Sequence, residues 1–252
     1  MASLSKRMKS YEKTINYILP PNLPIIIRID GRSFHTFTED LDKPFDFNFI
    51  SMMNAIGIAL CNEITGCRFA YLQSDEISLL VYKESIEESW FKNKFYKISS
   101  ISASLASATA MKWKYENNFK KDSIVSFDSR AYVIPYDDVI NYFIWRQNDW
   151  ERNSLNMLAR KYFSQKELIG KKKSELHELI HKAGDNWAKL PIYIKRGRTI
   201  IKTEISKYVE NPYYKGEVIR NKWIIDEKIP IFTENRGYIL SELSKIESKE
   251  TE

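Results

Sequence analysis

The order of strand-like runs in the first third of the chain constrains the fold more than any other feature. An alternating apolar run over residues 24–30 ends in an acidic residue. Two further strand-like runs, residues 68–73 and 77–82, flank a turn that carries two more acidic residues. These three carboxylates, at one strand end and one hairpin tip, are Asp30, Asp75 and Glu76.

Two predicted helices and a fourth strand complete a βαββαβ order. Asp46 is placed to start a helix, in which apolar residues recur at helical spacing until Gly66. A second helix is predicted from Trp90 to about Trp113, followed by a strand over residues 127–134. This order predicts an α+β, ferredoxin-like antiparallel sheet with helices on one face. Because its first and third strands are antiparallel neighbours, the three carboxylates should meet at one rim.

The second half of the chain reads as a helical and β extension. Residues 137–163 predict one long helix, with a polar stripe for which structural contacts and nucleic-acid contacts are equally good explanations. A short helix over 174–184, a strand pair or hairpin over 192–202 and strand-like pieces at 223–226 and 230–232 follow, before a charged tail at 247–252. The stripe consists of Arg146, Asp149, Asn153, Asn156 and Arg160. We expect a palm-like catalytic domain over 1–136 and an extension over 137–252 that packs on it.

Composition narrows the class of protein. A chain of 252 residues with 43% hydrophobic content can build a sizeable core. No apolar run approaches the roughly 18 residues of a membrane span, and Cys61 and Cys67 are too few for a Cys-only zinc site. The prediction is a cytoplasmic protein, with an organelle leader in the basic, Ser-rich first ten residues as the alternative. The net charge of +6 favours a polyanionic partner.

The carboxylates at the predicted rim suit a hard cation. Mg²⁺ takes oxygen ligands and usually only one or two protein carboxylates, which leaves positions for water and phosphates. Two such ions about 3.5–4 Å apart can stabilise the attacking and leaving oxygens of a phosphoryl displacement. The sequence therefore predicts a site for phosphate chemistry.

Six motifs in order resemble those of the histidine-tRNA guanylyltransferase family, over about residues 5–205. The matching runs are residues 28–37 (Arg-Ile-Asp-Gly-Arg-Ser-Phe-His-Thr-Phe), 73–76 (Gln-Ser-Asp-Glu), 90–92 (Trp-Phe-Lys), 127–130 (Phe-Asp-Ser-Arg), 145–149 (Trp-Arg-Gln-Asn-Asp) and 195–197 (Lys-Arg-Gly). Each motif is weak alone, and the ordered set is specific.

The resemblance implies a catalytic domain similar to a polymerase palm. Its two Mg²⁺ ions would be held by Asp30, the Gly31 backbone carbonyl and Asp75, with Glu76 in a supporting catalytic role. Members of the family add nucleotides to the 5′ end of tRNA, in the 3′-to-5′ direction. ATP first activates the RNA 5′-monophosphate, and the 3′-hydroxyl of an incoming nucleoside triphosphate, such as GTP, then displaces AMP. The family also implies a homotetramer, a dimer of dimers.

The resemblance and the charge pattern together give two sets of binding residues. Lys94 and Lys97 join the nucleotide set because we expect them at the carboxylate end of the fold, with a solvated helix start as the alternative. The nucleotide-binding set is Arg32, Ser33, Phe34, His35, Lys43, Asp46, Ser74, Lys94 and Lys97. The RNA-binding set is Arg130, Arg146, Asn153, Lys171, Lys172, Lys173, Lys195, Arg196 and Arg198.

One departure bears on the reaction. Family members that place a single guanylate on histidine tRNA carry a histidine where this chain has Glu151. The chain instead looks like the guanylyltransferase-like branch, which repairs 5′-truncated tRNAs by templated addition. Three alternatives stay open: non-templated guanylate addition to histidine tRNA, a palm-type nucleotidyl cyclase acting on mononucleotides, and a tRNA-binding protein with a vestigial site.

Overall fold

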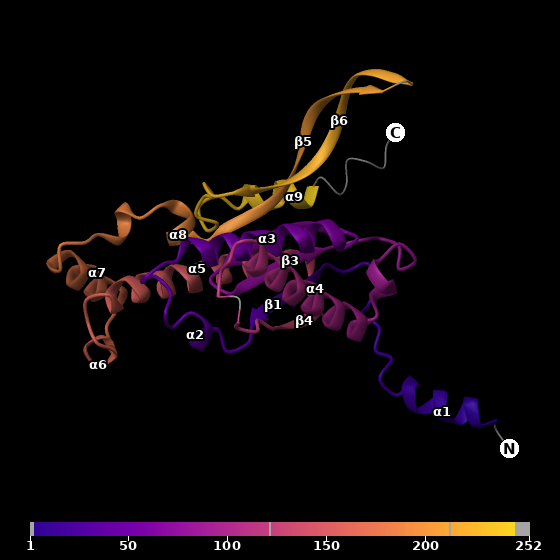
Figure 1. The fold of residues 1–252 in the computed structure, drawn as a ribbon, viewed down its shortest axis with the longest axis horizontal. Coiled ribbons are helices and arrows are strands. Elements are labelled where there is room, and N and C mark those ends of the chain that lie inside the picture. Colours follow the sequence, from indigo (N-terminus) through magenta and orange to yellow (C-terminus); the bar gives the residue numbers. More distant parts are fainter. Residues whose placement is uncertain (1–2, 121, 212, 245–252) are drawn as a thin grey trace.

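A six-stranded antiparallel sheet forms the centre of the molecule (Figure 1). The computed structural model describes residues 3–120, 122–211 and 213–244. Strand order is β4-β1-β3-β2-β5-β6, so the first four strands have the predicted ferredoxin-like order. The strands are β1 (Ile25–Gly31), β2 (Cys67–Gln73), β3 (Glu76–Val81), β4 (Phe127–Val133), β5 (Arg198–Asn211) and β6 (Tyr214–Asp226).

Helices cover both faces of this sheet. Helix α3 (Phe47–Glu63) begins as predicted at Asp46, whose Oδ1 accepts a hydrogen bond of 2.8 Å from the backbone N–H of Phe49. Helices α3 and α4 (Phe95–Glu116) pack on one face, and α5 (Tyr136–Arg160) packs on the other. The remaining elements are α1 (Leu4–Lys13), α2 (Phe34–Phe37), η1 (Trp90–Asn93), α6 (Gln165–Leu168), α7 (Lys173–Lys182), η2 (Trp187–Lys189), α8 (Ile192–Arg196) and α9 (Gly237–Ser244).

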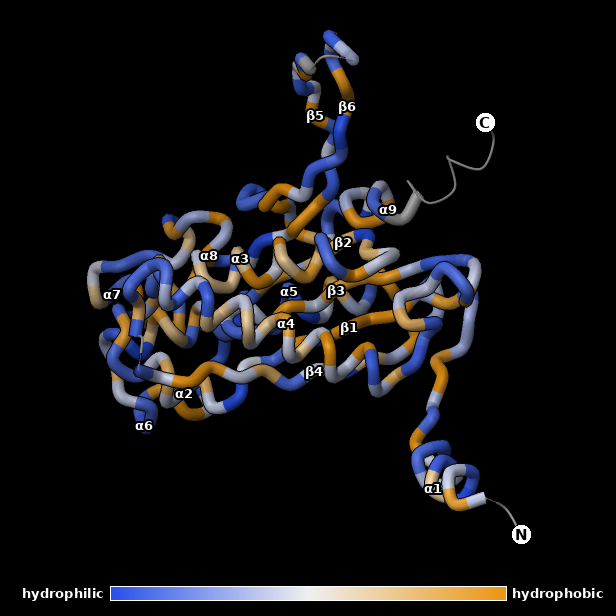
Figure 2. Tube along the Cα trace, turned by 45° about the vertical axis from the view of Figure 1, so that its right-hand side comes forward, coloured by the Kyte–Doolittle hydropathy of each residue, from blue (hydrophilic) through white to orange (hydrophobic). Residues whose placement is uncertain are grey.

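The alternation of β1 separates two hydrophobic cores. Ile25, Ile27 and Ile29 face α3 and α4 in the larger core, whereas Ile26 lies in the core beneath α5. Much of β1 carries the hydrophobic colour in Figure 2. On the α5 side, β1 changes from apolar Ile26 to Arg28 and Asp30, so polar side chains lie at this end of the strand.

The predicted helix over residues 90–113 is wrong at its start. Residues 90–93 form the short turn η1, in which Phe91 and Lys92 have φ of 51° and 52°, and helix α4 begins only at Phe95. The N-terminal segment explains the break, because the backbone N–H of Leu19 bonds to the Asn93 carbonyl and the Phe95 N–H bonds to the Tyr17 carbonyl. These long-range hydrogen bonds have no local sequence signal.

The C-terminal predictions need three corrections. Residues 192–196 form helix α8 instead of a strand, and β5 and β6 form a long hairpin beginning at Arg198. Residues 230–232 are not a strand: Ile229 and Phe232 pack beneath the sheet beside α9, a helix that the pattern did not reveal. The predicted tail at 247–252 lies outside the described residues. The division at 136/137 stays a prediction, although α5 packs directly on the palm.

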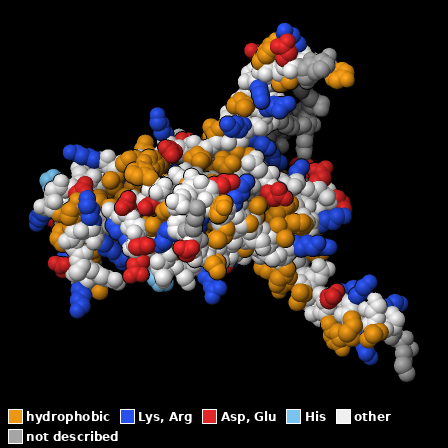
Figure 3. All heavy atoms as spheres, in the orientation of Figure 1, with side chains coloured by type: hydrophobic (Ala, Val, Ile, Leu, Met, Phe, Trp, Pro, Cys, Tyr) orange, Lys and Arg blue, Asp and Glu red, His pale blue; other side chains and the backbone are white. Residues whose placement is uncertain are grey.

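Two elements project from the body in Figure 1: helix α1 and the outer part of the β5–β6 hairpin. Lys and Arg side chains are scattered among acidic ones over the face seen in Figure 3. None of the helices in the described ranges is long and apolar enough to cross a membrane.

Gly197 joins α8 to β5 in a conformation that requires glycine. Its φ and ψ are 80° and −166°, and an added Cβ would lie 2.6 Å from the Leu72 carbonyl oxygen. We predict that Gly197→Ala lowers the free energy of unfolding by roughly 2–4 kcal/mol, from strain plus steric overlap. Urea denaturation measures this loss. Gly184→Ala is the control, since Gly184 has φ of 84° but open space around it, and equal losses for the two variants would contradict the argument.

Candidate active site

The strand register brings the predicted carboxylates together at one rim. Asp30 is the register partner of Glu76 across β1 and β3, and the Gly31 N–H donates to the Asp75 carbonyl over 3.2 Å. The meeting predicted from the ferredoxin-like topology is therefore confirmed. The tip of the β2–β3 turn reaches back over the end of β1, with Ser74 at its corner in a left-handed conformation of φ 44°.

A cleft of about 560 Å³ opens over this rim. Its floor carries Asp30 and the 73–76 turn, and its wall is the polar stripe of α5. The stripe residues that line it are Arg146, Asp149, Asn153, Asn156 and Arg160. Within the stripe, Arg146 makes structural ion pairs, whereas the nucleic-acid contacts of the residues farther along α5 stay a prediction.

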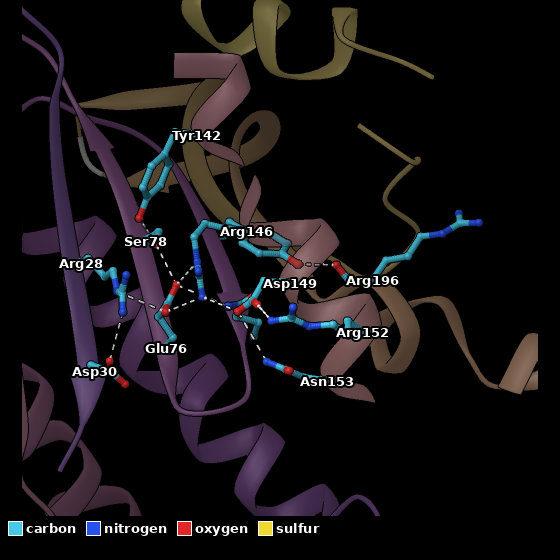
Figure 4. Close-up of polar contacts among 12 residues, drawn as sticks. Arg28, Asp30, Glu76, Ser78, Tyr142, Arg146, Asp149, Arg152, Asn153 and Arg196 are labelled. Atoms are coloured by element: carbon cyan, nitrogen blue, oxygen red, sulfur yellow. Dashed lines mark hydrogen bonds and ion pairs between the residues drawn. The ribbon is translucent and has the colours of Figure 1, made fainter. Parts of the chain in front are cut away.

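Arg146 and Glu76 form a buried ion pair at the base of the cleft (Figure 4). Nε and Nη2 of Arg146 each donate to a different Glu76 oxygen over 2.7 Å, and both side chains are less than 10% exposed. The Arg28 guanidinium also contacts the Glu76 carboxylate, at 3.2 Å. The same guanidinium lies 3.4 Å from the Asp30 carboxylate. Burial raises the pKa of Glu76, and the two arginines oppose that rise. Glu76 is thus held by two arginines, and its supporting catalytic role stays a prediction.

The pair extends inward through Ser78 and Tyr142, which the sequence predictions missed. The Ser78 hydroxyl donates to Glu76 over 3.3 Å and lies 2.8 Å from the Tyr142 hydroxyl. Ser78 follows Glu76 by two residues in β3, and Tyr142 precedes Arg146 by four in α5. Side chains two apart in a strand, or four apart in a helix, share a face. These spacings would have identified Ser78 and Tyr142 once Glu76 and Arg146 were paired.

Asp30 and Asp75 are the carboxylates available to a ligand. Burial raises the pKa of Asp75 to about 6, and the charge of Asp30 adds to the rise. No ion pair joins Asp75 to a cation in the described ranges, and the Asp30 side chain is 29% exposed. No group of three or more His, Cys, Asp or Glu side chains there is arranged to hold a metal. Asp75, which has no such ion pair, and Asp30, which shares Arg28 with Glu76, both line the open cleft and fit Mg²⁺, which needs few protein ligands.

A second, smaller cavity of about 80 Å³ adjoins the cleft. Three residues line both the cleft and this cavity: Ser74, Trp150 and Met157. Lys43 and Asp46, two residues of the predicted nucleotide-binding set, stand on its wall. The structure therefore brings Lys43, Asp46 and Ser74 close to the carboxylates.

The turn after β1 divides the other predicted nucleotide contacts. Arg32, Ser33 and His35 are exposed beside the rim. Phe34 is a correction: its side chain is 5% exposed and packs in the main core against the Phe127 ring. A Cβ on Gly31 would lie 2.3 Å from that Phe34 ring, so the rim residue next to Asp30 has to be glycine.

Lys94 and Lys97 do not lie at the carboxylate end, and that expectation is wrong. Lys94 pairs with Ile18, and its neighbour Asn93 lines a cavity with Ile25 and Val81. Ile25 and Val81 are register partners at the far end of β1 from Asp30. Helix α4 starts there because β3 runs away from the site. Within one chain, these lysines cannot reach the nucleotide cavity.

Comparison with known proteins identifies the family. The model of the family described as tRNAHis guanylyltransferase matches residues 5–135, which include all three rim carboxylates. The chain belongs to the tRNA(His) guanylyltransferase family. A probable tRNA(His) guanylyltransferase of Drosophila melanogaster is 31% identical over 215 residues, covering 79% of this chain and 73% of the fly protein. Members of this family are nucleotidyltransferases.

Two solved structures of the family are similar over nearly the whole chain. A bacterial tRNA(His) guanylyltransferase-like protein in complex with ATP has a TM-score of 0.83 and 36% identity, with 95% of this chain and 98% of that chain covered. A bacterial tRNA(His) guanylyltransferase-like protein in complex with GTP has a TM-score of 0.75 and 35% identity, with 96% and 99% covered. The similarity therefore includes α5 and the extension beyond residue 135.

The predicted RNA contacts fall into buried and exposed groups. Arg146 and Arg198 are corrections, because their side chains are 5% and 2% exposed and cannot bind RNA at the surface. Lys195 and Arg196 are partly exposed, and the Lys195 ammonium donates to the Ala188 carbonyl over 2.6 Å. The residues that stay accessible are Arg130, Asn153, Lys171, Lys172 and Lys173.

Glu151, the residue from which the repair branch was predicted, faces cations outside the cleft. Its carboxylate lies 3.4 Å from the Lys173 ammonium and 4.0 Å from the Arg196 guanidinium. These contacts connect α5 to the start of α7 and the end of α8. Glu151 therefore orders two members of the predicted RNA-binding set.

The Arg146–Glu76 pair should be essential to stability. We predict that Arg146→Met lowers the free energy of unfolding by about 3–5 kcal/mol, since it leaves a buried carboxylate uncompensated. Urea denaturation measures the loss, and adding Glu76→Gln should recover part of it. Arg152→Met is the matched control: Arg152 binds Asp149 at 2.7 Å but is 68% exposed, so its loss should stay below about 1 kcal/mol. Equal losses at both arginines would refute the role of the buried pair.

Proposed function

We propose that this chain adds nucleotides in the 3′-to-5′ direction to the 5′ end of tRNA, and that it repairs truncated ends by templated addition. The observation that carries the proposal is the cleft in which Asp30 and Asp75 face the polar stripe of α5. Carboxylates at a palm rim suit phosphate chemistry, and a wall of asparagine and arginine suits an RNA end.

Two Mg²⁺ ions would be held by Asp30, the Gly31 carbonyl and Asp75. When bound, they would offset the charge of the triphosphate and lower the pKa of the attacking hydroxyl. The ion pairs of Glu76 with two arginines compensate its negative charge, which would otherwise repel the phosphates. Arg28 and Arg146 thus leave Asp30 and Asp75 as the ligands at the rim.

The reaction has two transfers with balanced leaving groups. An oxygen of the RNA 5′-monophosphate attacks the α-phosphorus of ATP, which gives a 5′-adenylylated RNA and releases pyrophosphate. The 3′-hydroxyl of the incoming nucleoside triphosphate then attacks the RNA 5′-phosphorus and AMP leaves. Lys43, exposed on the wall of the smaller cavity, would hold triphosphate oxygens. Relatives solved with ATP and with GTP support nucleotide binding by this chain.

The RNA end would enter along α5. Asn153, Asn156 and Arg160 line the cleft beyond the rim, and Lys171 and Lys173 lie around the next cavity along the same helix, of about 260 Å³. Amide and guanidinium groups at regular helical spacing can follow a backbone of phosphates and riboses. A homotetramer, a dimer of dimers, is part of the proposal, so RNA contacts from another subunit are expected.

Glu151 supports templated repair over single guanylate addition. The Glu151 carboxylate contacts Lys173 and Arg196. It cannot replace the histidine imidazole that the resemblance implies at this position in members that add a single guanylate. Selection of the nucleotide would then depend on pairing with the template base.

Truncated tRNAs test this proposal. tRNAs that lack one 5′ nucleotide, with each of the four template bases opposite the gap, are offered all four nucleoside triphosphates and the products are sequenced. We predict that the nucleotide added is the Watson–Crick partner in every case. Asp30→Ala and Asp75→Ala are the controls, and each should lose addition while retaining tRNA binding. Guanylate addition whatever the template would contradict the repair reaction.

A further inference from the structure

The segment between α2 and α3, residues 38–46, forms one wall of the smaller cavity. Most of its residues line that cavity, and it lies outside the helices and strands on either side of it. Its α3 end is fixed by Asp46, whose second carboxylate oxygen accepts from the Asp42 N–H over 3.3 Å. A segment without helix or strand hydrogen bonds keeps its shape through contacts with the rest of the fold.

Lys120, about 80 residues farther along the chain, contacts the α2 end of this wall. Its ammonium donates to the Phe37 carbonyl over 2.5 Å and forms an ion pair with Asp40. The next carbonyl along, that of Thr38, accepts from the Lys43 ammonium. The Lys120 side chain is only 20% exposed, and a charged donor makes the stronger kind of hydrogen bond. The place of Lys43 therefore depends on how Lys120 holds the backbone beside it.

The backbone of Lys120 has a conformation that lysine rarely adopts. Its φ is 41°, in the left-handed region, where a residue with a side chain is strained. The Ser123 N–H and hydroxyl both donate to the Lys120 carbonyl, over 3.1 Å and 2.8 Å. The buried Lys114 ammonium of α4 donates in turn to the Ser123 hydroxyl over 2.7 Å. These contacts direct the Lys120 side chain toward α2.

Two ammonium groups share one aromatic ring in this cluster. Lys114 and Lys120 lie 5.4 Å and 5.0 Å from the centroid of the Phe37 ring. Burial lowers the pKa of Lys114, and the charge of Lys120 lowers it further. Like charges held this close, next to a strained residue, oppose folding. Stability alone does not account for the arrangement, and such strain is found where a functional segment has to be held.

We propose that Lys120 is a positioning residue for nucleotide binding, which holds the 38–46 wall so that Lys43 and Asp46 keep their places at the cavity. Lys114 supports it through Ser123. Without Lys120, the wall would occupy its binding-competent conformation for a smaller fraction of the time, and the apparent affinity would fall by that fraction. The inference rests on the proposed function, in which Lys43 holds triphosphate oxygens.

Nucleotide addition to the truncated tRNAs measures the effect on binding. At saturating RNA and ATP, Lys120→Met should raise the KM for the added nucleoside triphosphate roughly 10-fold and leave kcat within about 2-fold of wild type. Lys120→Arg keeps a cation with N–H donors and should recover most of the loss. Lys112→Met is the matched control and should behave as wild type, because Lys112 is an ion-paired lysine of α4 that is 75% exposed.

Hydrogen exchange on the full chain, without nucleotide or RNA, measures the wall itself. In Lys120→Met the amides of residues 38–46 should exchange faster than in wild type, whereas those of β1 should not change. This comparison does not depend on enzymatic activity. A wild type that adds no nucleotide would refute the proposed function, and exchange would still decide whether Lys120 holds the wall.

Wild-type KM and exchange in Lys120→Met would overturn the inference. A lower kcat with unchanged KM would also overturn it, since Lys120 would then act on the chemical step. Asp40→Asn keeps the test decisive if Lys120→Met fails to fold, because Asp40 is the exposed partner of the contact. It should raise KM about 2-fold and speed exchange of the same amides. Wild-type KM and exchange in Asp40→Asn, with Lys120→Met unfolded, would assign Lys120 to stability and reject the positioning role.

Discussion

The ion pair between Arg146 and Glu76 is the interaction on which the site depends. It joins α5 to the central strand β3 at the end where the polar cleft opens, with both side chains less than 10% exposed. Arg28 approaches the same carboxylate from β1, so three elements converge on Glu76. Burying these charges costs desolvation free energy. The ion pair is therefore stable only while Glu76 keeps both arginines as partners. The geometry of the rim therefore follows from how α5 is seated.

The packing of α5 against β3 gives the four acidic side chains of the cleft different surroundings. Glu76 and Asp149 are engaged with arginines and shape the wall, whereas Asp75 has no ion pair in the described part of the chain and Asp30 has only a 3.4 Å contact with Arg28. Asp30 and Asp75 are the few carboxylates that a divalent cation requires, and the ion pairs of Glu76 and Asp149 limit repulsion of the phosphates.

The sequence predicted the elements whose information is local and failed where distant segments decide. The alternation of β1, the turn at Ser74 and the cap at Asp46 lie in short windows, so the sheet order and the meeting of Asp30 with Asp75 followed. The break at Phe91 and the placing of Lys94 depend on hydrogen bonds to Tyr17 and Leu19, about 75 residues away in the chain. Arg198 resembled a surface cation because basic neighbours surround it; only the packing of Gly197 against β2 buries it.

Counting bound ions tests the proposal that Asp30 and Asp75 together hold the catalytic metals. Mn²⁺ in place of Mg²⁺ can be titrated by electron paramagnetic resonance in the presence of a non-hydrolysable ATP analogue. Two Mn²⁺ ions per chain are predicted for wild type and for Asp149→Asn, with at most one for Asp30→Asn and for Asp75→Asn. Two ions retained in either rim variant would contradict the claim.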